Sequence, residues 1–295
     1  RSGIGSSCLR PGDLDALLGA RAAVEFAGSA EFGDGRGAPL LQPLIEVDGV
    51  IQQFSAGTMA WERAMHWLPA FTCTFGDVVV RGTVFAPYGR DADLAGAVYA
   101  LGVENRGDVA HRVTVRMQGT LGHRQLRVRT SRPAEDAPRV SRSSGNLVVL
   151  EGSAQPGLVA LALGADDDAT VAIDGTRFSL ARTLEIAAGA NAQAAFYLAA
   201  GPERDGAEAT AAVLRRRGWR ALLAGTRDAL QQLEQSTGTD AVDRLINRNL
   251  LFAYFYGVAR ALDDAHYYLV RTRAPWHGAG ALQGHAGDCA GWPWS

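Results

Sequence analysis

The chain of 295 residues contains no lysine, so its 29 basic residues are all arginine, and its formal net charge is only −2. A charge this close to zero creates no long-range field that would draw nucleic acid or an anionic bilayer to the protein. Arg, Asp, Gln or Gly interrupts every apolar stretch well before the roughly 18 residues that a membrane span needs. The sequence therefore predicts neither nucleic-acid binding nor a membrane crossing.

Cysteine is also scarce. Cys8, Cys73 and Cys289 are odd in number and far apart, which disfavours a disulfide framework and offers no paired metal-ligand spacing. The six histidines show no His-Glu-x-x-His pattern, and no signal-peptide pattern is visible. We therefore expect no metal and no cofactor, and these absences favour a reducing, cytoplasmic location.

What the chain does contain, from Arg21 to Ala200, is a series of short β-type runs separated by Gly, Asp, Asn and Pro. About ten such runs predict an all-β fold with two packed antiparallel sheets. The expected strands are Leu44–Phe54, Phe71–Phe75, Val78–Ala86, Ala95–Val103, His111–Gly119, Leu147–Glu151, Leu158–Leu163, Thr170–Ile173, Phe178–Ile186 and Ala192–Leu198.

Alternation and turn chemistry support this prediction. In the run 111–117, Val113, Val115 and Met117 fall on one face of a strand, and polar residues fall on the other. Asp-Gly lies between apolar residues at 47–50 and between Ile173 and Thr176, as a tight hairpin requires. One face of each strand should be buried, and neighbouring strands should pair antiparallel.

The hydrophobic period changes from strand to helix after Gly201. Ala207–Arg217 and Trp219–Gln235 are rich in Ala, Leu and Arg and predict two helices. A third helix is expected over Asp240–Leu262, with Thr239 or Asp240 as its N-cap and Asp243 in its first turn. It becomes apolar nearly all round, which is typical of a helix enclosed by neighbours on several sides.

This order of elements resembles the six-hairpin glycosidase superfamily, which includes glucoamylase-like and amylo-α-1,6-glucosidase-like hydrolases and inverting disaccharide phosphorylases. The residues that carry the resemblance are 247–255 (NRNLLFAYF), 269–278 (LVRTRAPWHG) and 103–107 (VENRG). The resemblance implies a mainly β fold: a large two-sheet antiparallel super-sandwich over 1–200, a helical linker over 201–239 and the beginning of an (α/α)6 catalytic barrel over 240–295.

The function that the resemblance implies is the N-terminal part of a carbohydrate-active glycoside hydrolase, inverting and of the glucosidase or debranching type, acting on an oligo- or polysaccharide. Residues 278–295 contain one carboxylate and no helical face, so we expect a truncated or frame-shifted product that is inactive alone. Two alternatives stay open: an inverting glycoside phosphorylase fragment, and a non-catalytic β-sandwich carbohydrate-binding or interaction module. Sandwich domains in such proteins often help in dimer contacts, so a homodimer is a further alternative.

Inverting glycosyl transfer needs a general acid and, for hydrolysis, a base on the far side of the sugar. By resemblance both carboxylates lie in later barrel loops, so no catalytic residue is assigned, and Asp263 and Asp264 are better explained as a solvated helix end. Trp276 and His277 are the expected sugar contacts, because an indole stacks on a sugar ring and an imidazole can hydrogen-bond a hydroxyl. Arg273 is a third candidate for substrate binding.

Two other motifs are better explained by local structure than by a binding site. The segment 61–67 (WERAMHW) could form a second sugar-binding surface, but a bend between strands is the favoured reading. The arginines between His123 and Arg142 form a local basic excess without interleaved aromatics, and Pro133, Glu135, Asp136 and Pro138 interrupt it. A solvated strand and loop explains it better than a nucleic-acid site.

Overall fold

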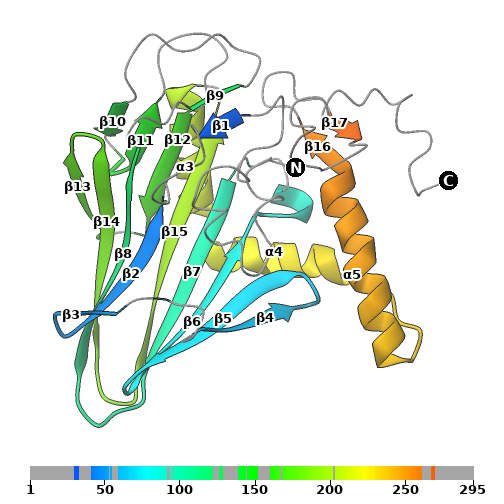
Figure 1. The fold of residues 1–295 in the computed structure, drawn as a ribbon, viewed down its shortest axis with the longest axis horizontal. Coiled ribbons are helices and arrows are strands. Elements are labelled where there is room, and N and C mark those ends of the chain that lie inside the picture. Colours follow the sequence, from blue (N-terminus) through cyan, green and yellow to red (C-terminus); the bar gives the residue numbers. More distant parts are fainter. Residues whose placement is uncertain are drawn as a thin grey trace.

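The computed structural model describes residues 30–32, 41–52, 54, 59–91, 94, 96–121, 126–128, 139–143, 145–151, 160–166, 168–201, 203–260 and 267–269. Of residues 30–32, 126–128, 250–260 and 267–269 only the backbone is described. Two antiparallel sheets face each other and helices lie beside them (Figure 1). The predicted mainly β fold, a two-sheet sandwich followed by helices, is confirmed.

The larger sheet has eight strands in the order β10-β11-β12-β15-β7-β6-β5-β4. The smaller sheet has five, in the order β13-β14-β8-β2-β3. The eight strands are β4 (Met59–Ala64), β5 (Leu68–Phe75), β6 (Val78–Phe85), β7 (Gly96–Asn105), β10 (Arg139–Arg142), β11 (Val148–Glu151), β12 (Ala160–Ala165) and β15 (Asn191–Gly201). The five are β2 (Gln42–Val47), β3 (Val50–Gln52), β8 (His111–Thr120), β13 (Thr170–Asp174) and β14 (Arg177–Ile186). Two short strands, β1 (Ala30–Phe32) and β9 (Leu126–Val128), pair with each other.

The central strands β7 and β15 are buried on both faces, and this explains why they are apolar almost throughout. An inner core lies between the two sheets and includes Ile45, Val80, Leu101, Val115, Phe178 and Phe196. An outer core lies between the eight-stranded sheet and the helices and includes Phe85, Val98, Val149, Tyr197, Leu214 and Leu222. Because successive side chains of a strand alternate between faces, such strands supply both cores.

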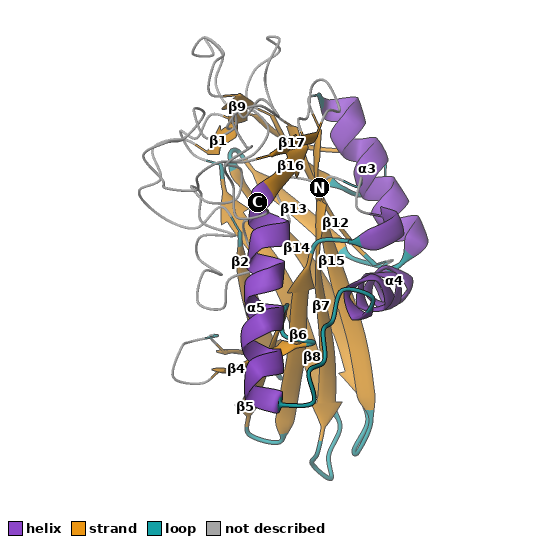
Figure 2. Ribbon diagram, turned by 90° about the vertical axis from the view of Figure 1, so that its right-hand side faces the viewer, coloured by secondary structure: helices purple, strands orange, loops and turns teal. Residues whose placement is uncertain are grey.

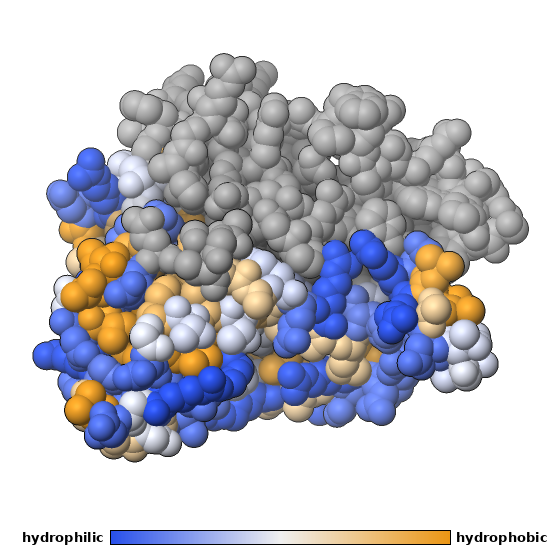
Figure 3. Space-filling view, turned by 60° about the horizontal axis from the view of Figure 1, so that its bottom comes forward, coloured by the Kyte–Doolittle hydropathy of each residue, from blue (hydrophilic) through white to orange (hydrophobic). Residues whose placement is uncertain are grey.

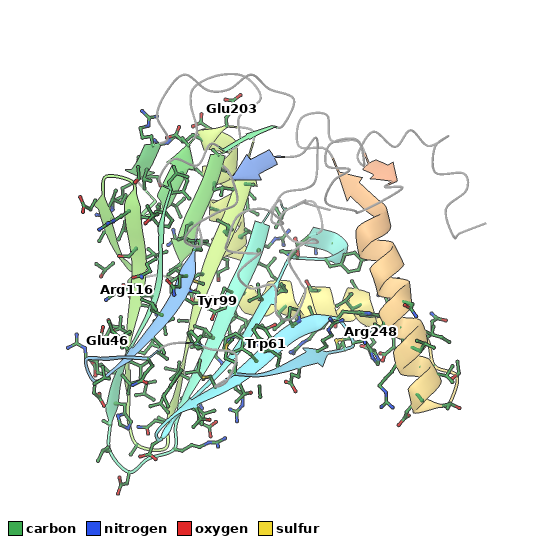
Figure 4. The ribbon with its side chains drawn as sticks, viewed as in Figure 1. Glu46, Trp61, Tyr99, Arg116, Glu203 and Arg248 are labelled. Carbon is green, nitrogen blue, oxygen red and sulfur yellow. The ribbon has the colours of Figure 1, made fainter. Side chains whose placement is uncertain are left out.

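The smaller sheet has one buried and one polar face. On β8, Val113, Val115 and Met117 are buried in the inner core, as the alternation predicted. Arg116 on the other face lies 3.8 Å from Glu46 of β2 (Figure 4). This sheet therefore closes the sandwich on one side and meets solvent on the other.

The turn of the first Asp-Gly hairpin lies where it was predicted, and the turn of the second lies one residue later than predicted. Val47 pairs with Val50, and the turn residues Asp48 and Gly49 both have positive φ, which Gly and Asp tolerate in a tight hairpin. In the second hairpin, β13 extends through Asp174, and Gly175–Thr176 form the turn. The strand is one residue longer than predicted because Asp174 pairs with Arg177 and does not occupy the turn.

Two helices cover the outer face of the eight-stranded sheet (Figure 2). They are α3 (Arg204–Arg217) and α4 (Trp219–Gln231), so α4 ends four residues before the predicted Gln235. The loop 86–91, which includes the short 3-10 helix η1 (Gly89–Asp91), fixes α4, because Tyr88 N donates to the buried Thr226 Oγ1 at 3.0 Å. A Cβ on Gly89 would lie 2.5 Å from Ala229 Cβ, and its φ is +72°. Only glycine fits this close approach.

The third helix, α5 (Asp240–Gly257), starts at the predicted residue and ends five residues before the predicted Leu262. Its last residue is glycine, a common helix terminator, and the short strands β16 (Val258–Arg260) and β17 (Tyr267–Leu269) follow. Within the part of the chain that the structure describes, no helix is long and apolar enough to cross a membrane.

The segment 61–67 is strand and turn, not only a bend. Trp61–Ala64 belong to β4, which pairs with β5 as the edge of the larger sheet. Met65 and His66 have positive φ values of 51° and 65° in the turn that follows. The alternation of this segment was obscured because an edge strand is polar on both faces along part of its length.

Candidate functional site

The three predicted sugar contacts, Trp276, His277 and Arg273, lie outside the described residues, and so do Asp263 and Asp264. Their roles remain predictions. What the structure does describe is the joint through which the sandwich holds α5, together with two of the three motifs that carried the family resemblance.

The motif at 103–107 forms the end of β7 and a locked turn. Asn105 is buried, and its Nδ2 donates to the carbonyl oxygens of Val109, Ile186 and Ala187 at 2.7, 3.2 and 3.0 Å. Its Oδ1 accepts from Gly107 N at 2.9 Å. A buried amide that satisfies three carbonyls joins two turns at one end of the sandwich. This part of the motif is therefore structural.

Glu104 of the same motif lies outside the core. Its carboxylate pairs with Arg81 at 2.6 Å and with Arg106 at 3.0 Å. The hydrogen bonds from Arg106 and then Arg81 lower the pKa of Glu104. A half-buried carboxylate held between two arginines stays ionised and is a poor general acid.

The joint with α5 begins at Trp67, the last residue of the β4–β5 turn. This indole is buried, and its Nε1 donates to the backbone oxygen of Asn247 in α5 at 2.8 Å. The two residues are 180 positions apart in sequence. The bond therefore connects an early strand turn directly to the third helix.

Asn247 also fixes the connection between α4 and α5. It is fully buried, its Oδ1 accepts from Gln235 N at 2.8 Å, and its Nδ2 donates to Gln235 O at 2.8 Å. This two-bond arrangement satisfies both ends of the amide and both backbone groups of Gln235. The second motif of the resemblance thus starts with a residue that sets the angle at which α5 leaves the sandwich.

Asp243, one turn earlier in α5, caps the same connection. Its Oδ1 accepts from Thr237 N and from Thr237 Oγ1, both at 2.6 Å, and its Oδ2 accepts from Ser236 Oγ at 3.3 Å. The hydrogen bonds from Thr237 lower the pKa of Asp243. Beside it, His66 Nε2 lies 3.1 Å from Glu234 Oε1. The β4–β5 turn, the connection and α5 therefore form one bonded unit.

Acidification should loosen this joint. Because the folded-state pKa of Asp243 is below its ordinary value of 3.8, its contribution to stability is present above that value and is lost as the pH falls through the folded-state pKa. We expect Asp243→Asn to be less stable than the wild type at pH 7 and to differ less from it at pH 3. Urea unfolding at both pH values measures the difference, with the exposed Asp240→Asn as control. An Asp243→Asn deficit that does not shrink in acid would contradict the assignment.

A second polar network holds α4 on the larger sheet. Tyr197 Oη donates to Asp166 Oδ1 at 2.9 Å and accepts from Trp219 N, the first residue of α4, at 3.1 Å. Asp166 Oδ2 accepts from Ala195 N at 2.9 Å. Burial, and then the Asp166 charge, raise the pKa of Tyr197, so the phenol stays protonated as a donor. This network orients a helix and has no reacting partner in reach among the described side chains.

Trp61, considered as a sugar platform, packs into an aromatic cluster. Its ring centroid is 5.3 Å from that of Phe71, which also contacts Phe54 edge-on at 5.7 Å and stacks with Tyr99 at 6.0 Å. Burial raises the pKa of Tyr99, whose Oη has no hydrogen-bond partner in the structure. Figure 4 shows Trp61 and Tyr99 on the larger sheet. The cluster is an extension of the inner core.

One Asp–His pair resembles a catalytic dyad but has a structural role. Asp48 Oδ2 lies 2.6 Å from His111 Nδ1, and Asp48 Oδ1 accepts from Arg112 N at 2.8 Å. These bonds, first that from Arg112, lower the pKa of Asp48. His111 Nε2 is buried, so substrate cannot reach it, and the pair pins the β2–β3 turn to β8. Among the residues whose side chains are described, no group of three His, Cys, Asp or Glu could hold a metal ion.

Sequence reasoning named the segments of this joint but not their partners. Trp67 belongs to the segment predicted to form a bend between strands, and Asn247 belongs to a motif of the resemblance. Residues 180 positions apart in sequence give no local signal that they meet. A weak signal was available, because an Asn in an otherwise apolar helix needs hydrogen-bond partners.

No protein-family model matches the chain, and no curated protein of similar sequence was found. Solved structures that resemble it include a bacterial glucoamylase complexed with acarbose, which has 10% identity, a TM-score of 0.49, 73% coverage of this chain and 35% of that chain. A protein described as a kojibiose phosphorylase from human microbiome has 9% identity, a TM-score of 0.36 and coverage of 79% and 30%.

The family GH92 α-mannosidase from Bacteroides thetaiotaomicron has 10% identity, a TM-score of 0.25 and coverage of 76% and 32%. The chain thus spans about a third of the length of each of these proteins. Their names include a glucoamylase and a phosphorylase, two of the three classes of enzyme that the sequence resemblance named.

Proposed function

We propose that the chain is the sandwich and first barrel helix of a carbohydrate-active enzyme, an inverting glycoside hydrolase of the six-hairpin type that acts on an oligo- or polysaccharide. The observation that carries the proposal is the joint: buried Trp67 and Asn247 fix α5 to the sandwich, while Val242 and Leu245 of α5 remain exposed. A helix that is anchored at one side and apolar at the other is suited to begin a further helical layer.

The proposal divides the chain into the sandwich at 1–200, the linker at 201–239 and the start of the barrel from 240. Helices α3 and α4 support the linker role, because both pack on the larger sheet before the chain turns at Gln235. Trp276, His277 and Arg273, in the segment after α5, are proposed to border the sugar pocket. The general acid and base are assigned to segments that follow the first barrel helix, and the chain alone is proposed to be inactive, in the cytoplasm.

Sugar release tests the proposal. The chain alone is incubated with maltose, isomaltose and starch, with and without phosphate, and glucose and glucose 1-phosphate are measured. We expect no turnover by this chain and phosphate-independent release of glucose by a protein in which the barrel follows it. Phosphate-dependent release of the sugar phosphate would instead indicate a phosphorylase. Turnover by the chain alone would overturn the assignment of the carboxylates.

A measurement of sugar binding distinguishes the proposed enzyme fragment from a non-catalytic binding module. If the pocket is shared with the barrel, the chain alone should show no saturable binding of these sugars in calorimetry. In the longer protein, Trp276→Ala should raise KM about tenfold because a stacking contact is lost, and Trp61→Phe should not. Saturable sugar binding by the chain alone, abolished by Trp61→Ala, would favour a non-catalytic module.

A further inference from the structure

Asp-Gly dipeptides occur in the sequence at 34–35, 48–49, 174–175 and 205–206. Aspartate isomerises most readily before glycine, because glycine has no side chain to hinder the approach of its backbone nitrogen to the aspartate carboxyl group. The reaction needs a carboxyl group that is free to rotate and a main chain with room to rearrange. The structure describes three of the four dipeptides and places them in different surroundings.

The carboxylate of the dipeptide at 48–49 is fixed through both oxygens. Asp48 Oδ1 accepts from Arg112 N at 2.8 Å, and Asp48 Oδ2 lies 2.6 Å from His111 Nδ1. The bond from Arg112, and then that from His111, lower the pKa of Asp48. The protonated carboxyl group, which is the form that a backbone nitrogen attacks, is therefore scarce at neutral pH. This turn is protected although it is exposed.

The dipeptide at 205–206 is protected by its backbone. It lies in the first turn of α3, where the helix fixes the dihedral angles of both residues. Gly201 packs directly against this turn, since a Cβ on Gly201 would lie 2.7 Å from Gly206 C and 2.4 Å from Ala207 N. The main chain here has no room for the additional carbon that isomerisation inserts into it.

Neither form of protection exists at 174–175. Asp174 and Gly175 are exposed, and neither the Asp174 carboxylate nor Gly175 N forms a hydrogen bond or ion pair with any residue that the structure describes. A Cβ on Gly175 would meet no atom within 4 Å. The dipeptide ends β13, the edge strand next to β14 (Figure 1), and such a strand end opens more easily than a central strand. Hydrophilic residues cover much of the described surface in Figure 3, so a turn at this surface meets water.

We propose that Asp174 is the position at which the folded chain isomerises spontaneously to isoaspartate. Gly175 N attacks Cγ of the protonated carboxyl group, the N–Cγ bond forms, and the hydroxyl group leaves as water with the amide proton. Water then adds to the backbone carbonyl carbon of the resulting succinimide and breaks the bond from that carbon to Gly175 N. The main chain now passes through Cβ and Cγ of Asp174. No oxidant or reductant takes part, and the inference does not rest on the proposed function.

Isomerisation should loosen one end of the smaller sheet. Asp174 pairs with Arg177, and Thr176 O accepts from Leu121 N at 2.9 Å. An additional carbon in the main chain displaces both contacts. Because Leu121 is fully buried, we expect hydrogen exchange at its backbone N–H to accelerate in the isomerised protein and to stay unchanged in β7.

The test uses the full chain, incubated at neutral pH and physiological temperature, once folded and once in urea. Trypsin then places the four dipeptides on different peptides, because an arginine lies between each two of them along the chain. An isoaspartate methyltransferase with labelled S-adenosylmethionine marks the peptides that contain isoaspartate. Among the three described dipeptides, we expect the label on 174–175 in the folded chain and on all three in urea, where unfolding removes the protection.

Asp174→Glu should abolish the label on the 174–175 peptide, because the ring that glutamate would form is one atom larger and forms far more slowly. Asp205→Glu is the matched control and should leave that label unchanged. His111→Ala releases one oxygen of Asp48 and should add label at 48–49. Circular dichroism should show that all three variants are folded.

Equal label on the three peptides from the folded chain would overturn the proposal. So would label at 174–175 that appears only in urea, or that persists in Asp174→Glu. The dipeptide at 34–35 lies outside the described residues, and its label is read on a peptide of its own. None of these outcomes depends on sugar turnover, so failure of the proposed function is recognised separately by the sugar-release assay.

Discussion

Replacing Gly82 by alanine is expected to lower the free energy of unfolding by about 3 kcal/mol, the upper range for overpacking a core. Gly82 lies on β6 opposite Phe71, and a Cβ at this position would be 2.2 Å from the ring of Phe71 and 2.9 Å from Leu101 Cδ2. Phe71 is buried and contacts Trp61, Phe54 and Tyr99, so its ring has no free space to move into. Urea unfolding measures the loss.

The control is Gly102→Ala on the neighbouring strand β7, where a Cβ would meet only Arg81 O at 3.9 Å. It should change stability by no more than about 0.5 kcal/mol. The double variant Gly82→Ala with Phe71→Leu should be more stable than the sum of the two single effects predicts, because the smaller side chain vacates the space that the methyl needs. Equal effects of Gly82→Ala and Gly102→Ala would contradict the packing described for the inner core.

Asn247→Ala is expected to lower the free energy of unfolding by about 2 kcal/mol, because it removes two hydrogen bonds and leaves both backbone groups of Gln235 without a partner. The loss should be local. Hydrogen exchange should speed up in the first turns of α5 and at Gln235, and should be unchanged in β7 and β15.

Asn249→Ala is the matched control, since Asn249 is exposed on the same helix. It should change the free energy of unfolding and the hydrogen exchange of α5 very little. Trp67→Phe removes the indole N–H that reaches Asn247 O together with part of the volume of a buried ring, and should therefore also increase exchange in α5. If Asn247→Ala and Asn249→Ala have the same effect on stability and on hydrogen exchange in α5, the joint does not hold α5, and the structural basis of the proposed function is lost.

The sandwich could be predicted from the sequence because period-2 alternation and turn residues are local signals. Val113, Val115 and Met117 fell on the buried face, and the turn at Asp48–Gly49 was located correctly. Strands without such signals were missed. β10 contains Arg139 and Arg142, and its place in the sheet depends on pairing with the apolar β11, which is a tertiary effect that propensity does not report.

The contacts that form the joint could not be predicted from the sequence, for a similar reason. Its bonds connect Trp67 with Asn247 and His66 with Glu234, over separations of 180 and 168 residues. Residue types alone do not specify such contacts, because each of these side chains could equally be satisfied by solvent or by a near neighbour. Of the residues in the joint, the motifs of the resemblance contain only Asn247, and the geometry shows what that residue contacts.

The central claim, that α5 is the first of several barrel helices, is tested most directly by reading the coding DNA beyond the codon for Ser295 in all three frames. The account predicts a sequence of amphipathic helices containing two carboxylates in loops between them. A genuine stop codon with no helical-barrel sequence in any frame would contradict it. The chain would then be a sandwich module whose α5 contacts a separate partner protein.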